Sequence, residues 1–195
     1  MTVVPSRRRA DAEPVSDAAL LAAIPGGDLG ALGLLYDRHA AAVWRVVHRV
    51  TNGANDIDDI VHATFMKVPA LAHAFDGRPS ARGWLIGIAV RLALRHLRGM
   101  GRLTRMLARF AYVSRAADDL DPEIVARGRA KIAVVERALA TLPAAKRAVF
   151  VMIEIEGLTH EEVARDLGIP LPTVRTRLFH AKRALSAALQ AAERP

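Results

Sequence analysis

A basic helix near the C-terminus carries the side chains best suited to contact nucleic acid. Five apolar residues recur every three or four positions, which predicts the buried face of a helix starting near Pro172. At about 100° per residue, hydroxyl, imidazole and guanidinium groups fall on the opposite face. Such groups can hydrogen-bond to base edges in the major groove while neighbouring cations contact phosphates. The apolar residues are Val174, Leu178, Ala181, Leu185 and Leu189, and the candidate DNA-contacting residues are Thr173, Arg175, Thr176, Arg177, His180, Lys182 and Arg183.

The residues before this helix predict a second, shorter helix and a tight turn. Thr159 and Glu162 have the spacing of a capping box, in which each side chain accepts a hydrogen bond from the other residue's backbone N–H. Gly168 can take the left-handed conformation that ends a helix, and Ile169-Pro170 supplies the turn. The segment from Thr159 to Leu189 is therefore predicted to be a helix-turn-helix. The basic side of the second helix could instead be an ordinary solvent-exposed charged face. The capping box, Gly168, the short turn and the basic helix occur together, which favours DNA binding.

The composition favours a polyanionic partner and excludes several classes of protein. The chain has 195 residues, with 28 lysines and arginines against 20 aspartates and glutamates, a formal net charge of +8. Basic surface gains affinity for nucleic acid by releasing counterions from phosphates. No segment has the ~18 consecutive apolar residues of a membrane span, and the first residues lack the apolar core of a signal peptide, so we expect a cytoplasmic protein without membrane insertion. The absence of cysteine excludes disulfides, thiolate nucleophiles and cysteine-ligated zinc.

Helical periodicity predicts an all-α chain with two small helical domains joined by a tether. Residues 1–16 lack apolar periodicity and are expected to form a disordered leader. Residues 17–98 are predicted to form the first helical domain, and residues 99–130 the tether. Residues 131–190 are predicted to form the second domain, which ends in the helix-turn-helix.

Cap and turn residues divide the first domain into helices. The expected helices run from Asp28 to Thr51, from about Asp56 to Val68, and from Ser80 to about Arg98. Pro69 should bend or close the second helix, because proline cannot continue the backbone hydrogen bonding. Ser80 is a suitable N-cap for the third helix, and Gly99 and Gly101 should end it.

The third predicted helix combines a basic stripe with a tryptophan. Arg91, Arg95 and Arg98 recur at intervals of four and three, so they could follow the backbone of a nucleic acid strand. Trp84 could in principle stack on a base. Its spacing with the apolar residues of the same helix instead predicts that it faces the core.

Two sets of motifs resemble the extracytoplasmic-function RNA polymerase sigma factors. The stretches similar to region 4 of that family are Leu142–Phe150, Glu156–Ala164, Gly168-Ile169-Pro170 and Thr173–Leu178. The stretches similar to its region 2 are Leu35–His39, Asp58–Val68, and Phe75 with Ser80–Leu85 and the helix that runs on to Arg98. The resemblance covers roughly Asp28 to Leu189. It implies two helical domains joined by a tether, and no enzymatic activity.

The resemblance implies a protein that binds core RNA polymerase and directs it to promoter DNA. The helix over Asp56–Val68 would dock on the coiled coil of the polymerase beta-prime subunit, and the beta flap is a second implied contact. The C-terminal helix would read the −35 element as duplex, while the loop and helix from Phe75 to Arg98 would melt and hold the −10 element. An anti-sigma protein is an implied further partner. The implied polymerase contacts are Asp58, Asp59, His62 and Lys67, and the implied −10 contacts are Asp76, Arg78, Ser80, Arg82, Arg91, Arg95 and Arg98.

The chain departs from the family pattern at four places. Family members commonly carry Gln-Glu where this chain has His62-Ala63, and Trp where it has Pro69. We therefore expect a beta-prime contact that departs from the standard one and a shorter or bent polymerase-binding helix. Arg91 replaces the usual Asn, which leaves the −10 sequence preference open, whereas Pro172 replaces a usual Gly and only stiffens the start of its helix.

Two other functions remain open at this point. Asp58 or Asp59 with His62 has a spacing that metal ligands use. No P-loop, GxSxG, HExxH or dinucleotide fingerprint accompanies it, so we expect no catalytic residue, metal or cofactor. The other alternative is a stand-alone helix-turn-helix regulator, which would bind duplex DNA without polymerase, usually as a dimer on a two-fold site.

Overall fold

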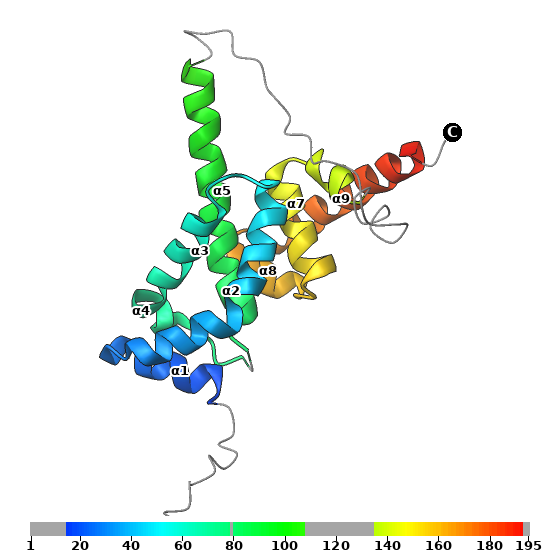
Figure 1. Cartoon of the computed structure of the whole chain (residues 1–195). Coiled ribbons are helices and arrows are strands. Elements are labelled where there is room, and N and C mark those ends of the chain that lie inside the picture. The colour runs from blue at the N-terminus through cyan, green and yellow to red at the C-terminus, as the bar shows by residue number, and fades with distance from the viewer. Residues whose placement is uncertain (1–14, 79, 108–134, 193–195) are drawn as a thin grey trace, which may run out of the picture.

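All regular secondary structure in the described part of the chain is helical (Figure 1). The structure is a computed structural model that describes residues 15–78, 80–107 and 135–192. The all-α prediction is confirmed within these ranges, while residues 1–14 of the predicted leader and 108–130 of the predicted tether lie outside them. No helix in the described ranges is long and apolar enough to cross a membrane.

The N-terminal unit contains two long helices, α2 and α5, with shorter helices around them. Asp28 caps α2 by accepting a hydrogen bond from the Ala31 N–H at 2.9 Å, and Asn52 ends the helix in the left-handed conformation. α3 ends at Met66 and Pro69 lies in the first turn of α4, so the predicted interruption of the second helix near Pro69 is confirmed. The helices of this unit are α1 (Asp17–Ala23), α2 (Leu29–Thr51), α3 (Ile57–Met66), α4 (Val68–Leu71) and α5 (Arg82–Leu107), with 3-10 turns η1 (Ile24–Gly26) and η2 (Ala72–Ala74).

α5 is longer than the sequence indicated. It continues through Gly99 and Gly101 to Leu107, so the predicted helix end near Arg98 is wrong and residues 99–107 of the predicted tether are helical. A glycine inside a helix costs only about 1 kcal/mol relative to alanine. The arginine, leucine and methionine residues around these two glycines are good helix formers and offset that cost.

The C-terminal unit is a set of shorter helices that ends in one long helix. Pro143 directly precedes α7 at its N-cap, where the missing N–H of proline removes no helical hydrogen bond. After the helical residues 135–140, the elements are α7 (Ala144–Phe150), the π-helical segment η3 (Val151–Ile155), α8 (His160–Leu167) and α9 (Leu171–Ala192).

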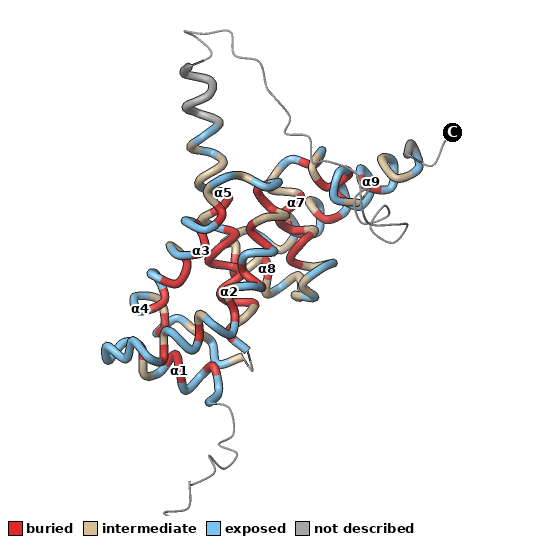
Figure 2. Tube along the Cα trace, viewed as in Figure 1, coloured by how far each residue is buried: buried red, intermediate tan, exposed pale blue. Residues whose placement is uncertain are grey.

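Apolar residues from both units form one continuous core. Buried residues of α2, α3 and α5 lie in the same cluster as Val149, Met152 and Val163 of the C-terminal unit. A second cluster joins Leu139 to Leu185 and packs residues 135–140 on α9. Figure 2 shows the buried residues where α2 and α5 meet the C-terminal unit. The two units therefore pack directly against each other.

Candidate nucleic-acid interface

The predicted helix-turn-helix is formed by α8 and α9. The Glu162 N–H donates to Thr159 Oγ1 at 3.1 Å, and the Thr159 N–H donates to Glu162 Oε2 at 2.8 Å, so the capping box is complete. Gly168 ends α8 with a φ of +64°, in the left-handed region that favours glycine. Ile169-Pro170 then leads directly into α9. Every local signal used to predict this motif is confirmed.

The two sides of α9 differ as predicted. Its buried residues are Val174, Leu178, Ala181 and Leu185, whereas Leu189 is half-buried. On the opposite side, Lys182 forms an ion pair with Glu154 at 2.8 Å. The exposed candidate residues are Arg175, Thr176, His180, Lys182 and Arg183, with Thr173 and Arg177 half-buried. The predicted set of DNA-contacting residues is therefore gathered on the polar side of one helix.

Phe179 is a member of this side that the sequence analysis did not single out. It is 61% exposed, and its ring lies edge-on to His180 with 5.6 Å between ring centroids. Phenylalanine side chains are usually buried. On a DNA-binding helix, an exposed phenylalanine can make an apolar contact with a thymine methyl group. Its position outside the buried repeat was the available sequence signal.

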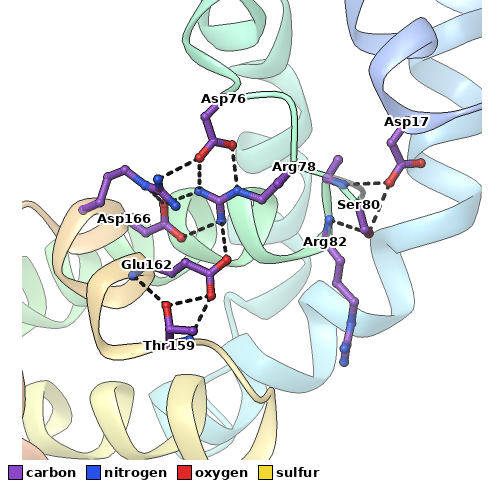
Figure 3. Close-up of polar contacts among 10 residues, drawn as sticks. Asp17, Asp76, Arg78, Ser80, Arg82, Thr159, Glu162 and Asp166 are labelled. Atoms are coloured by element: carbon purple, nitrogen blue, oxygen red, sulfur yellow. Dashed lines mark hydrogen bonds and ion pairs between the residues drawn. The ribbon is translucent and has the colours of Figure 1, made fainter.

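Arg78 lies at the centre of an ion-pair network that joins the two units (Figure 3). Its guanidinium donates to both carboxylate oxygens of Asp76, at 2.8 and 3.0 Å, within its own loop. It also donates to both carboxylate oxygens of Asp166 on α8, at 3.2 Å each, and lies 3.8 Å from Glu162. Arg165 pairs with Asp76 at 2.9 Å. The side chains of Arg78 and Asp166 are only 12% and 5% exposed, so neither is available to DNA in this arrangement.

Two further candidate −10 residues contact the C-terminal unit. Arg82 forms an ion pair with Glu156, which precedes α8. Arg91 donates to the backbone carbonyl of Asp166 at 2.6 Å. Together with Asp76 and Arg78, these residues place much of the predicted −10 surface in contact with α8 and the segment before it.

The other candidate −10 residues form no hydrogen bond or ion pair with the described residues of the C-terminal unit. The Ser80 hydroxyl accepts a hydrogen bond from the Arg82 N–H, as expected of a residue that caps α5. Arg95 and Arg98 are exposed on α5 and form no ion pair with any described residue. Trp84 is 7% exposed and packs edge-on against Phe75, so the prediction that it faces the core is confirmed.

Burial and hydrogen bonding act in opposite directions on the charges of this network. Burial raises the pKa of Asp166, and the hydrogen bonds from Arg78 offset that effect only in part. Burial also opposes the charge on Arg78, but its hydrogen bonds to Asp76 and Asp166 outweigh it and raise its pKa. The hydrogen bonds from Arg78 lower the pKa of Asp76, and the Thr159 N–H lowers that of Glu162. The two shifts therefore favour opposite charge states in the buried pair: the carboxylates around Arg78 favour its charged form, whereas burial of Asp166 outweighs Arg78 and the more distant Arg165, at 3.9 Å, and favours its neutral form.

Two glycines on α5 allow this close approach. A Cβ at Gly83 would lie 2.8 Å from Cδ2 of Leu158, and a Cβ at Gly87 would lie 2.7 Å from the Cβ of Asp166. At Gly87 the neighbouring atom is a Cβ close to the backbone of α8, so a larger residue there would push α8 away, whereas at Gly83 the end of the Leu158 side chain would have to move. The i, i+4 spacing of these glycines was the sequence signal for a close helix contact.

Arg147 of α7 is a buried cation that the sequence analysis missed. It donates to the carbonyl oxygens of Val50 at 3.0 Å and Ala140 at 3.1 Å, and burial lowers its pKa. Because Val50 belongs to the last turn of α2, Arg147 joins α7 to the N-terminal unit. No local sequence pattern connects residues so far apart.

The candidate polymerase contacts lie on the exposed side of α3. They are Asp58, Asp59, His62 and Lys67, and all four are exposed. Asp58 accepts a hydrogen bond from Trp44 Nε1 at 3.0 Å, and His62 Nε2 lies 3.4 Å from the Tyr36 hydroxyl. These side chains line a hollow of about 180 Å³ between α2 and α3. Within the described residues, no group of three side chains suited to hold a metal ion occurs.

Comparison with known proteins identifies both units. The family description "Sigma-70 region 2" matches residues 35–103, and "Sigma-70, region 4" matches residues 132–185. The ECF RNA polymerase sigma factor SigE of Mycolicibacterium smegmatis is 32% identical over 152 residues, which are 77% of this chain; the chain spans 58% of the length of that relative.

Two solved structures share the fold. CnrH, in complex with the cytosolic domain of CnrY, is 27% identical with a TM-score of 0.60, over 90% of this chain and 97% of CnrH. The sigma factor RpoE from Bartonella quintana, in complex with the anti-sigma factor NepR, is 20% identical with a TM-score of 0.60, over 80% of this chain and 93% of that one. The second likeness concerns the fold alone.

The two matched regions coincide with the two packed units, and the helix-turn-helix lies within the second. α1 precedes the region 2 match, which begins at residue 35. The chain belongs to the extracytoplasmic-function RNA polymerase sigma factors, which are initiation factors rather than enzymes and direct promoter recognition and transcription initiation through sigma-70 regions 2 and 4.

Proposed function

We propose that this sigma factor holds a promoter at two points, with α9 on the −35 duplex and the loop before α5 on the −10 element. The helix-turn-helix carries the proposal, because α9 is buried on one side and polar and basic on the other. A helix fits the major groove, where arginine, threonine and histidine read base edges. Thr176 and Arg177 are the proposed base contacts. The recognition face comprises Thr173, Arg175, Thr176, Arg177, His180, Lys182 and Arg183.

The −10 surface is assigned to the loop after Phe75 and to the arginines of α5. The loop would shape a pocket for an extruded base, which requires a preformed concavity. The arginines would follow the backbone of the melted strand. The proposed −10 contacts are Asp76, Arg78, Ser80, Arg82, Arg91, Arg95 and Arg98.

Promoter binding requires the two units to separate. The −10 and −35 elements lie about 25 base pairs apart, or on the order of 85 Å along duplex DNA. In the described arrangement, Arg78 of the −10 surface is in direct contact with Asp166 of the helix-turn-helix. We therefore propose that the packed arrangement is the resting form and that the promoter complex is open.

Core RNA polymerase is the proposed partner of α3. The exposed side of α3 carries both acidic and basic groups beside the hollow lined by Tyr36 and Trp44. Such a side is suited to bind the polar surface of a partner helix. We propose that this side docks on the beta-prime coiled coil and that the C-terminal unit contacts the beta flap. The proposed contacts with polymerase are Asp58, Asp59, His62 and Lys67. Because bacterial polymerase acts in the cytoplasm, we propose the same location for this chain.

An anti-sigma protein is a further proposed partner. CnrH was solved with the cytosolic domain of CnrY, and RpoE from Bartonella quintana with the anti-sigma factor NepR. A protein that binds across both units would oppose the separation that promoter binding requires. Such a partner would reduce transcription without touching the recognition face.

Transcription with purified components tests the proposed function. The full chain and core RNA polymerase are mixed with a library of double-stranded promoters in which both elements are randomised. We expect transcripts from a defined subset of promoters only when both proteins are present. If the core gains no promoter specificity while the chain alone protects a two-fold DNA site, the stand-alone regulator replaces this proposal.

A further inference from the structure

Asp17 of α1 is a buried carboxylate at the meeting point of three elements. It is 5% exposed, although aspartate is seldom buried without partners. Its partners come from α2 and from the loop that leads into α5, as the right side of Figure 3 shows for Ser80. Asp17 precedes the segment that matches region 2, and the sequence analysis assigned it no role.

Four donors share the two oxygens of Asp17. Oδ2 accepts from the Ala81 N–H at 2.7 Å, from His39 Nε2 at 2.8 Å and from the Ser80 hydroxyl at 3.3 Å. Oδ1 accepts from Arg38 Nη1 at 2.5 Å. The carboxylate therefore joins the residues immediately before α5 to two neighbouring side chains of α2.

The ionised form of Asp17 is favoured by these donors. Burial alone would raise the pKa of Asp17, but the Ala81 N–H, Arg38 and His39 outweigh burial and hold it below its ordinary value. An anion also interacts favourably with the N-terminus of a long helix, where backbone N–H groups are unpaired. Asp17 thus fixes the start of α5 by charge as well as by a directed hydrogen bond.

Both ends of the −10 loop are held within the N-terminal unit. At one end Phe75 packs edge-on against Trp84, with 5.6 Å between ring centroids. At the other end Asp17 holds Ser80 and Ala81. The contacts in the middle of the loop are different, because they reach across to the C-terminal unit through Arg78 and are lost when the units separate.

We propose that Asp17 is a positioning residue for −10 recognition, which holds Ser80 and Ala81 at the end of the −10 loop in place when the C-terminal unit has moved away. This inference rests on the proposed −10 role of that loop. It makes α1 part of the promoter-binding machinery. Asp17 itself touches no DNA in this proposal and acts through Ser80, Ala81 and the start of α5.

The test compares Asp17→Ala with a control that lowers stability elsewhere in the same unit. Asp28→Ala removes the cap of α2, where Asp28 accepts the Ala31 N–H at 2.9 Å, and leaves the −10 loop untouched. Each full-length variant is combined with core polymerase. Transcription is measured on a promoter selected by the unsubstituted chain, and on versions of it with single substitutions in the −10 or −35 element.

We expect Asp17→Ala to reduce discrimination among −10 sequences by about tenfold, the worth of one lost base contact. Discrimination among −35 sequences should not change, and Asp28→Ala should retain both at a comparable loss of thermal stability. Asp17→Asn keeps one acceptor for the Ala81 N–H and should lose less. If Asp17→Ala does not fold, Asp17→Asn decides alone, with a loss of about threefold or more supporting the proposal.

Three outcomes would overturn the inference. They are unchanged −10 discrimination in the folded Asp17 variants, an equal loss in Asp28→Ala, and a parallel loss at the −35 element. In each case Asp17 would serve stability alone. Absence of promoter-specific transcription with the unsubstituted chain is a different result, because it rejects the proposed function and leaves no −10 preference to measure.

Discussion

The two proposed DNA-contacting surfaces differ in their readiness to bind. The recognition face of α9 is turned to solvent, and Lys182 alone of its residues has an ion pair within the described chain. The −10 surface is partly engaged, since Arg78, Arg82 and Arg91 all contact the C-terminal unit while Arg95 and Arg98 stay exposed. The same helix-turn-helix that presents α9 outward presents α8 inward. One surface can therefore meet DNA at once, whereas the other depends on a rearrangement.

This difference follows from the charges on α8 and the segment before it. Glu156, Glu162 and Asp166 supply the carboxylates that face the arginines of the −10 surface. Arginines that suit phosphate also suit carboxylate, because both present oxygens to the planar guanidinium. In the packed form, carboxylates of the C-terminal unit thus bind the same arginines that are proposed to bind the −10 strand in the open form.

The largest expected effect is on the exposed surface. Arg177→Ala should lower transcription from selected promoters by roughly 5- to 150-fold, since a base contact contributes about 1–3 kcal/mol. Arg137→Ala, which removes an exposed charge from residues 135–140 on the other side of α9, should have little effect. Transcription titrations on selected and −35-substituted promoters provide the measurement. An equal loss on every sequence would assign Arg177 to a phosphate instead.

A second effect is expected at the partly engaged −10 surface. Gly87→Ala should favour the separated form by about 1–2 kcal/mol, or roughly 5- to 30-fold, because its Cβ would overlap Asp166. The matched control is Gly99→Ala on the same helix, where no atom lies within 4 Å of the added Cβ. Both variants gain helix propensity, and only the first introduces the overlap.

Separation of the units can be measured by energy transfer between two dyes. The chain has no cysteine, so Ala70→Cys and Ala184→Cys would introduce unique labelling sites on exposed positions of the two units. Transfer efficiency should fall in Gly87→Ala and stay unchanged in Gly99→Ala. Equal efficiency in both would mean that the packed arrangement is not the resting form.

A smaller effect is expected for the arginines of α5 that remain exposed. Arg95→Ala should reduce the salt dependence of holoenzyme binding by about one unit of slope and impair melting of the −10 region more than initial binding. Arg45→Ala removes an exposed charge from α2 and serves as the control. Permanganate reactivity of thymines in the −10 region reports melting. Unchanged reactivity in Arg95→Ala would remove this residue from the −10 surface.

Features set by neighbours in the sequence could be predicted. The capping box at Thr159, the left-handed Gly168 and the buried face of α9 depend on residues within a few positions of one another. Trp84 was assigned to the core by the same reasoning. Periodicity and capping are local properties, so they survive in the sequence as patterns.

Features set by packing between distant segments could not be predicted. Arg78 and Asp166 are 88 positions apart, and Asp17 meets Ala81 across 64. Neither pair has a spacing that helical periodicity would indicate. Arg78 could therefore be proposed as a DNA contact from the sequence, but its pairing with Asp166 could not. Pairings of this kind depend on how helices pack, and a single sequence does not report that.

The smallest expected effect is the pH dependence of separation, which follows from Asp166. Its pKa is raised in the packed form because burial outweighs Arg78, and exposure on separation would return it to the ordinary value. A carboxyl group whose pKa is higher in the packed form stabilises that form when the pH is below the ordinary pKa. This stabilisation is lost as the pH rises through the raised pKa. Mild acidification should therefore favour the packed form.

Asp166→Asn tests this direction, because asparagine has nearly the same shape and does not titrate. Energy transfer in the labelled chain should rise as pH falls from about 7 towards the ordinary aspartate pKa of about 3.9, and the rise should be absent in the variant. The hydrogen bonds from Arg78 lower the pKa of Asp76, so its opposing contribution is lost only at lower pH. A packed form that opens on mild acidification would show that pairing with Arg78, rather than burial, controls Asp166.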